Sequence, residues 1–384
     1  MKTVINIFLI LILSIVLFIF LSGKTWLFNA VNTTYFRGYS SAYIEDFKNF
    51  PSNKIQNDKH QKWNISSDFN KTELPEYINT LNKDLETVAF LVIVNDSILH
   101  EQYWHGYNEQ SVSNSFSMSK SWISTLIGIA IKEGYISSIN QKVCDFLPAF
   151  SNGNNCEITI KDLLTMSSGL KWSENYYNPI GQAAESYYGD NLRSLVMNLE
   201  SVEAPGQIFR YNSACTQLLT YILEEATGET VSEYIGQKLW KPMGAKYPAL
   251  WSKDSEKGDE KGFCCINSNA RDFGRLGRLY LNFGNWEGLQ ILDTSYIKDA
   301  TSPAKLFKPE GKKNINYGYQ FWLTNYKNDF VYYARGLWGQ YVICIPEKNM
   351  IIVRLGRKSG TEMDNGHFDD LYSYIKAAIE IIGT

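Results

Sequence analysis

The sequence predicts an α+β fold, in which an antiparallel sheet is flanked by helices and a helical lobe is inserted between its strands. Strand-like segments occur at residues 88–104 and again in the last third of the chain. The stretch between them, about residues 125–290, reads as mostly helical. Strands that are far apart in the sequence must therefore pair in one sheet.

The first 23 residues form an apolar N-terminal segment. Within residues 4–21 only Asn6 and Ser14 are polar, and at about 1.5 Å per residue a helix of this length just crosses a bilayer core. Lys2 precedes the run, which favours a cytoplasmic N-terminus. No Ala-x-Ala cleavage site follows, so we expect an uncleaved membrane anchor, with a cleaved signal peptide as the alternative. Either way we expect the rest of the chain outside the cytoplasm, anchored or secreted.

Residues 24–85 are polar and aromatic without a clear period, and are predicted to be a stalk and an irregular N-terminal segment. A hydrolase domain is predicted for residues 86–384. It begins with a hairpin, in which strands at residues 88–94 and 98–104 are joined by a turn at residues 95–97.

The helical lobe carries several start and stop signals. Thr159 precedes Asp162 as an N-cap would, and Gly169 ends that helix. A Pro-Gly turn at residues 205–206 leads into an apolar helix at residues 218–223, and another helix starts near Ala270. The remaining segments return to strands and one final helix. The strands are expected at residues 317–323, 330–334, 340–345 and 350–355, and the helix at residues 368–382.

Composition excludes several classes of function. The net charge is −3 and no block of Lys or Arg occurs, which argues against a nucleic-acid partner. The six cysteines form neither a Cys-x-x-Cys motif nor a Cys/His cluster, so we expect no metal site and no cofactor. Cys144 and Cys156 flank a loop and are candidates for a local disulfide. Adjacent Cys264 and Cys265 are expected to point to opposite faces of a strand and to serve packing.

The strongest chemical signal is Ser117 followed by Lys120, at the start of an apolar helix. Residues three apart share one face of a helix, so the amine can reach the hydroxyl. Serine becomes a nucleophile when a base takes its proton, and lysine is that base when burial lowers its pKa. Four other Ser-x-x-Lys pairs exist, but only Ser117 has a strand pair before it and a strongly apolar helix after it.

From about residue 86 onward the chain resembles the serine β-lactamase and penicillin-binding superfamily. It is most similar to the class C-like branch of esterases, D-amino-acid peptidases and 6-aminohexanoate-dimer hydrolases. The resemblance rests on ordered segments rather than on one tetrapeptide. These segments are residues 115–121, 162–170, 205–213, 270–272 and 334–340.

The resemblance implies a role for each matching residue. Ser117 would be acylated, Lys120 would be its base and Tyr211 would shuttle a proton. The backbone N–H groups of Ser117 and of Leu337, which follows Gly336, would form the oxyanion hole. Three further residues are expected to bind substrate or to line the site. They are Asn212, Ser213 and Gln340.

Two departures from the family pattern bear on substrate. The second motif reads Tyr211-Asn212-Ser213, with serine where asparagine is usual, as in the nylon-oligomer hydrolase branch. The third motif starts with Ala334 where Lys or His is usual, and Arg335 should face away because neighbouring strand residues alternate. A cation there would bind a substrate carboxylate, so we do not expect β-lactamase or D,D-carboxypeptidase activity.

We therefore predict a serine hydrolase that cleaves an amide or ester through an acyl-enzyme. A cell-wall D-amino-acid peptidase or transacylase is the alternative among enzymes. A non-catalytic homologue that binds cell-wall peptide is the alternative from another class. Substrate selectivity is expected to depend on the loops at residues 172–190 and 305–315.

Overall fold

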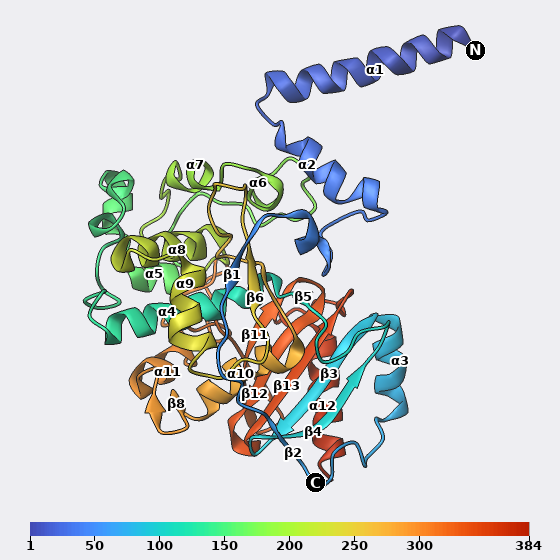
Figure 1. Ribbon diagram of the computed structural model, residues 1–384. Coiled ribbons are helices and arrows are strands. Elements are labelled where there is room, and N and C mark those ends of the chain that lie inside the picture. The colour runs from blue at the N-terminus through green and yellow to red at the C-terminus, as the bar shows by residue number, and fades with distance from the viewer. Residues whose placement is uncertain (384) are drawn as a thin grey trace.

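The central sheet of the computed structural model, which describes residues 1–383, confirms the α+β prediction (Figure 1). Its strand order is β10-β11-β12-β13-β3-β4-β2, and all neighbours are antiparallel except β2 and β4. The bounds are β2 Asn64–Ile65, β3 Thr87–Val94, β4 Ser97–Tyr103, β10 Trp322–Tyr326, β11 Asp329–Gly336, β12 Gln340–Ile345 and β13 Met350–Gly356. The predicted hairpin and the C-terminal strands thus meet where β13 pairs with β3.

Both faces of this sheet are covered by helices. Helix α10 (Ala270–Leu281) packs against Ile93 and Val353, and the small residues Gly274 and Gly277 allow its close approach. Helix α12 (Asp369–Ile381) packs on the other face, where Tyr374 contacts Phe90. Because successive strand residues point to opposite faces, strands buried on both sides read as the nearly continuous apolar run seen in β3.

A second, smaller sheet has the order β1-β6-β7-β5. Its strands are β1 Ser52–Ile55, β5 Ser113–Asn114, β6 Ala249–Ser252 and β7 Ile266–Ser268. Strand β1 lies in the predicted stalk and pairs with β6, and α3 (Glu76–Asp84) packs against α12. Strand β1 and helix α3, both within residues 24–85, are therefore packed parts of the folded domain.

The helical lobe lies above and to the left of the central sheet in Figure 1. Its α-helices are α4 Ser119–Lys132, α5 Ile160–Leu164, α6 Gln182–Tyr188, α7 Leu192–Met197, α8 Ser213–Thr227 and α9 Val231–Ile235. Helix α11 (Thr294–Ala300) lies beside the lobe. A short β8–β9 hairpin (Asn285–Trp286, Leu289–Gln290) precedes α11. Helices α4 and α8 are almost fully buried and contact each other, so they form the centre of the lobe.

Helix α1 (Lys2–Leu21) extends away from the rest of the molecule at the N-terminus (Figure 1). Its mean hydropathy is 3.2 and none of its residues is buried, so it is long and apolar enough to be a transmembrane segment or a signal anchor. Helix α2 (Trp26–Thr33) follows it and contacts α6.

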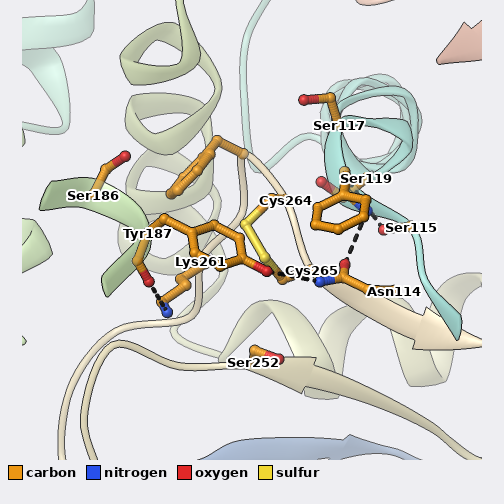
Figure 2. The surroundings of a disulfide bond; sticks show 12 residues. Asn114, Ser115, Ser117, Ser119, Ser186, Tyr187, Ser252, Lys261, Cys264 and Cys265 are labelled. Atoms are coloured by element: carbon orange, nitrogen blue, oxygen red, sulfur yellow. Dashed lines mark hydrogen bonds between the residues drawn. A yellow bond between two sulfur atoms is a disulfide. The ribbon is translucent and has the colours of Figure 1, made fainter. Parts of the chain in front are cut away.

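Two local predictions are wrong. The strand expected from residue 317 begins only at Trp322, because Gln320 has a left-handed backbone and its amide bonds to the lobe at Leu163 and Leu164. Cys264 and Cys265 do not face apart, since their sulfur atoms are bonded to each other (Figure 2). Cys265 has a φ of +78°, so the extended geometry that would alternate the two side chains starts only after it.

The disulfide considered for Cys144 and Cys156 is not formed, and both thiols are free. The 3₁₀ turn Gly153–Glu157 directs the Cys156 sulfur to the Gly153 carbonyl, 3.0 Å away. The Cys144 sulfur lies 3.7 Å from the carbonyl of Cys156.

Candidate active site

Ser117 lies in the 3₁₀ turn η3 (Phe116–Met118), between β5 and α4. The preceding residue, Phe116, has a φ of +44°, which is rare for a residue with a side chain. The Asn114 side chain holds this turn by accepting a hydrogen bond from the Phe116 N–H at 2.9 Å. Ser117 remains partly exposed while its neighbours are buried, so its hydroxyl is accessible from outside the core.

Lys120 occupies the first turn of α4 and is 1% exposed. Its Nζ lies 3.1 Å from the Ser117 hydroxyl, 3.1 Å from the Ser213 hydroxyl and 2.6 Å from the Phe263 carbonyl. Burial lowers the pKa of Lys120 to about 8, and the carboxylate of Glu174 partly opposes that shift. A neutral amine is therefore available near neutral pH, within hydrogen-bond distance of a hydroxyl.

Tyr211 brings a phenol to the same place. Its ring centroid lies 5.3 Å from the Lys120 Nζ, and it stacks on Trp322 at 5.5 Å. Burial and Glu174 raise the pKa of Tyr211 above its usual range, whereas the Ser117 hydroxyl and Arg335 lower it. The phenol is thus neutral at pH 7 and adjoins both Ser117 and Lys120.

The end of β11 lies against the turn that carries Ser117. A Cβ on Gly336 would be 2.1 Å from the Ser115 carbonyl, so only glycine allows this approach. The chain then turns through Leu337–Gly339, where Trp338 has a φ of +61°. Gly336 and Leu337 are therefore placed beside Ser117, where the resemblance implies an oxyanion hole.

The remaining predicted site residues have different surroundings. Ser213 begins α8 and contacts Lys120 directly. Asn212 caps the same helix by accepting from the Ala214 N–H at 2.9 Å. Gln340 is fully buried, and its amide bonds to the backbone of Leu337 and Gly356 behind the turn. Asn212 and Gln340 thus bond to the backbone that shapes the site.

Two residues of the site were not predicted individually. Glu174 accepts hydrogen bonds from the Ser213 N–H and from the Trp172 indole, the latter at 3.1 Å. Tyr176 is exposed, and its hydroxyl lies near Glu174 and Ser213. Both lie in the loop expected to govern selectivity, but no local motif distinguishes them, because their position depends on how this loop folds back over α8.

A cavity of about 380 Å³ adjoins Tyr211. Its lining includes the aromatic rings of Phe209, Tyr211 and Trp322, together with Lys308 and Glu362. Ala334 is buried, and Arg335 places its guanidinium 3.7 Å from the Trp322 ring centroid, where it also donates to the Gly366 carbonyl. Arg335 thus influences Tyr211 through its charge, from the side of Trp322.

The profile of the beta-lactamase family matches residues 74–371 of the chain. The chain belongs to the beta-lactamase family. It is therefore an enzyme of a family of serine hydrolases that act on amide or ester bonds. Within residues 1–383, no group of three or more His, Cys, Asp or Glu side chains is arranged to hold a metal ion.

Named relatives of this family member include several hydrolases. It is 26% identical over 325 residues to the 6-aminohexanoate-dimer hydrolase of Paenarthrobacter ureafaciens, covering 79% of this chain and 80% of that protein. It is 25% identical over 304 residues to protein flp of Staphylococcus aureus, covering 70% and 58%.

Solved structures show the same fold. A 6-aminohexanoate-dimer hydrolase candidate from Bacillus anthracis has a TM-score of 0.75 at 22% identity, covering 88% of this chain and 92% of that one. A family VIII carboxylesterase has a TM-score of 0.62 at 15% identity, covering 79% and 95%.

Gly336→Ala tests the close approach of β11 to the Ser117 turn. The added Cβ must push the strand from Ser115, so we expect a loss of about 1–3 kcal/mol in unfolding free energy. A shift of the site by even 1 Å should slow modification of Ser117 by about 100-fold. Denaturant unfolding and the rate of labelling by a fluorophosphonate measure the two effects.

Gly236→Ala is the matched control, because its Cβ would be in ordinary contact at 3.5 Å and its φ is −58°. It should leave the labelling rate unchanged. If Gly336→Ala unfolds and labels as the wild type does, the close contact between Gly336 and the Ser115 carbonyl is wrong.

Proposed function

We propose that this enzyme hydrolyses an amide or ester through an acyl-enzyme on Ser117, with Lys120 as base and Tyr211 as proton shuttle. The observation that carries the proposal is the 3.1 Å contact between the Ser117 hydroxyl and a buried amine with a pKa of about 8. A lysine becomes a base when burial destabilises its charged form, and a serine becomes a nucleophile when such a base adjoins it.

Acylation begins when the Ser117 oxygen attacks the substrate carbonyl carbon and its proton passes to Lys120. The carbonyl π electrons move to oxygen, and the N–H groups of Ser117 and Leu337 donate to the resulting oxyanion. When the tetrahedral intermediate collapses, the bond to the leaving nitrogen or oxygen breaks, and Tyr211 relays the Lys120 proton to that atom. In deacylation water attacks the acyl carbon, and its proton passes to Lys120. The bond between the acyl carbon and the Ser117 oxygen then breaks, the proton returns to that oxygen, and the acid is released.

The remaining residues of the site would position these groups. Ser213 offers Lys120 a second hydrogen-bonding partner, while Asn212 and Gln340 hold the backbone around Tyr211 and Leu337. The cavity beside Tyr211 would receive one part of the substrate. Its aromatic rings would pack against apolar atoms of the substrate, while Arg210, Lys308 and Glu362 offer charged contacts.

Two observations support a linear amide or an ester as the substrate. Relatives carry the names 6-aminohexanoate-dimer hydrolase and carboxylesterase, which favour a linear amide or an ester. The third-motif position holds Ala334, which offers no cation for a substrate carboxylate. A cell-wall peptidase or transacylase remains the second candidate, supported by the likeness to the N-acetylmuramyl-L-alanine amidase of Bacillus subtilis, 22% identical over 277 residues.

We also propose that α1 anchors the enzyme in a membrane with the catalytic domain outside the cytoplasm. The support is the fully exposed apolar helix, together with the Cys264–Cys265 disulfide, since disulfides persist mainly in oxidising compartments. In this arrangement the substrate is extracytoplasmic.

Covalent labelling tests the nucleophile. After exposure to a fluorophosphonate, we expect intact-mass and peptide mass spectrometry to find one adduct, on Ser117, and none on Ser117→Ala. Lys120→Met, which keeps the side-chain length without the amine, should label at least about 1,000-fold more slowly. Failure of the wild type to label would remove the support for an enzymatic Ser117, and unchanged labelling of Lys120→Met would exclude Lys120 as base.

Membrane extraction tests the anchor. Full-length protein should stay with the membrane fraction after an alkaline carbonate wash and keep its complete mass. Replacing three central α1 residues, Leu11, Leu13 and Val16, by Asp should release it, because each buried charge costs about 3 kcal/mol in a helix centre. A soluble product that lacks the first 20 or so residues would instead identify α1 as a cleaved signal.

A further inference from the structure

Glu174 is a carboxylate beside the candidate machinery that the mechanism above does not use. One of its oxygens, Oε1, accepts from the Ser213 N–H and from the Trp172 indole. The other, Oε2, is buried and accepts no hydrogen bond of good distance and angle within the described chain, although the Tyr176 hydroxyl lies close to the carboxylate. A carboxylate oxygen that is desolvated without a partner is costly, so its charge must be balanced by a nearby group.

Lys120 is the group that balances it. Glu174 favours the Lys120 ammonium, and among the groups that do so its effect is larger than that of the Cys215 thiol. The Cys215 thiol has a pKa raised to about 12 by burial, so it carries no charge near neutral pH. The two side chains are also joined through one residue, because Ser213 donates its N–H to Glu174 and has its hydroxyl 3.1 Å from the Lys120 Nζ.

We propose that Glu174 is a positioning residue that supplies the negative charge against which Lys120 takes up the Ser117 proton. This inference rests on the function proposed above and adds to it a third member, so that the site acts as a Ser117–Lys120–Glu174 unit joined through Ser213. No bond to Glu174 forms or breaks. Its side chain stabilises the cation that proton transfer creates on Lys120.

The energetic reason lies in the burial of Lys120. In the form that reacts the amine is neutral, and it accepts a proton in a place where water cannot solvate the charge. Hydroxyl and carbonyl partners stabilise the ammonium only in part. An anion that is already fixed by two hydrogen bonds stabilises it without reorganising, and therefore lowers the barrier to acylation.

The same charge raises the pH at which the base becomes active, against the larger effect of burial. The phenols of Tyr176, Tyr211 and Tyr317 also face Lys120 or its partners, and burial raises the pKa of each, so they stay neutral. The Arg335 guanidinium lies 3.7 Å from the Trp322 ring centroid. Glu174 raises the pKa of Lys120, so removing its charge must lower that pKa and move the rise of activity to lower pH.

Glu174→Gln in the full-length protein tests the inference. The amide keeps an oxygen that accepts from Ser213 and Trp172 while the charge is lost. The measured quantity is the second-order rate of Ser117 modification by a fluorophosphonate between pH 5 and 10. We expect the midpoint of the rise to move to lower pH, and the plateau rate to fall by about 10–100-fold, as for loss of one electrostatic contact in a site.

Two variants separate charge from structure. Glu174→Asp keeps the charge and should keep the wild-type midpoint even if its rate falls. Glu157→Gln removes an exposed carboxylate that lies 2.7 Å from Lys142, outside both loops expected to govern selectivity, and should change neither quantity. Thermal unfolding of each variant checks that the fold is retained.

The labelling rates distinguish a wrong role for Glu174 from a wrong role for Ser117. A midpoint in Glu174→Gln that stays in place or moves up, or a plateau rate equal to that of the wild type, would overturn the role of Glu174 while Ser117 still labels. If wild-type Ser117 does not label at all, the proposed function fails and this inference fails with it.

Discussion

A single buried amine, that of Lys120, connects the packing of this enzyme to its proposed chemistry. An ammonium group in the protein interior is stable only with good hydrogen-bonding partners. Here the partners come from separate parts of the chain, namely the turn before α4, the start of α8 and the segment before β7. The Lys120 amine therefore lies where the helical lobe and the segment leading into the small sheet contact each other.

The same region is held by two further constraints. Gly336 lets the end of the central sheet reach the Ser117 turn, which no larger residue would permit. On the other side, buried Asp46 of the N-terminal segment accepts from Tyr187 at 2.8 Å, and Asn114 donates to Tyr187 at 3.0 Å. Asn114 in turn fixes the Phe116 backbone. The segment that follows the apolar N-terminal helix is thus connected to the nucleophile turn through three side chains.

Local sequence was sufficient for much of this arrangement. Apolar periodicity located β3, β12, α4 and α12, and the spacing of Ser117 and Lys120 predicted their contact, because i and i+3 positions share a helix face. The family resemblance brought in Tyr211 and Gly336, which periodicity alone would have left as a buried aromatic residue and a strand glycine.

The features that were missed depend on tertiary contacts. Glu174 lies in an irregular loop, and its importance comes from the start of α8, 39 residues later. The bend at Gln320 replaces a predicted strand because a buried amide bonds to the lobe. Cys264 and Cys265 were expected to alternate, and the left-handed backbone of Cys265 prevents this. A single sequence contains no pattern from which these contacts can be read.

The proposed chemistry requires that Lys120 lose its proton near pH 8 while it stays within hydrogen-bond distance of Ser117. The most direct measurement is an NMR titration of the Lys120 side chain, with ¹³C-labelled lysine assigned by comparison with Lys120→Met. We expect a midpoint at about pH 8. A side chain that stays charged beyond pH 10, as an exposed lysine does, would contradict it.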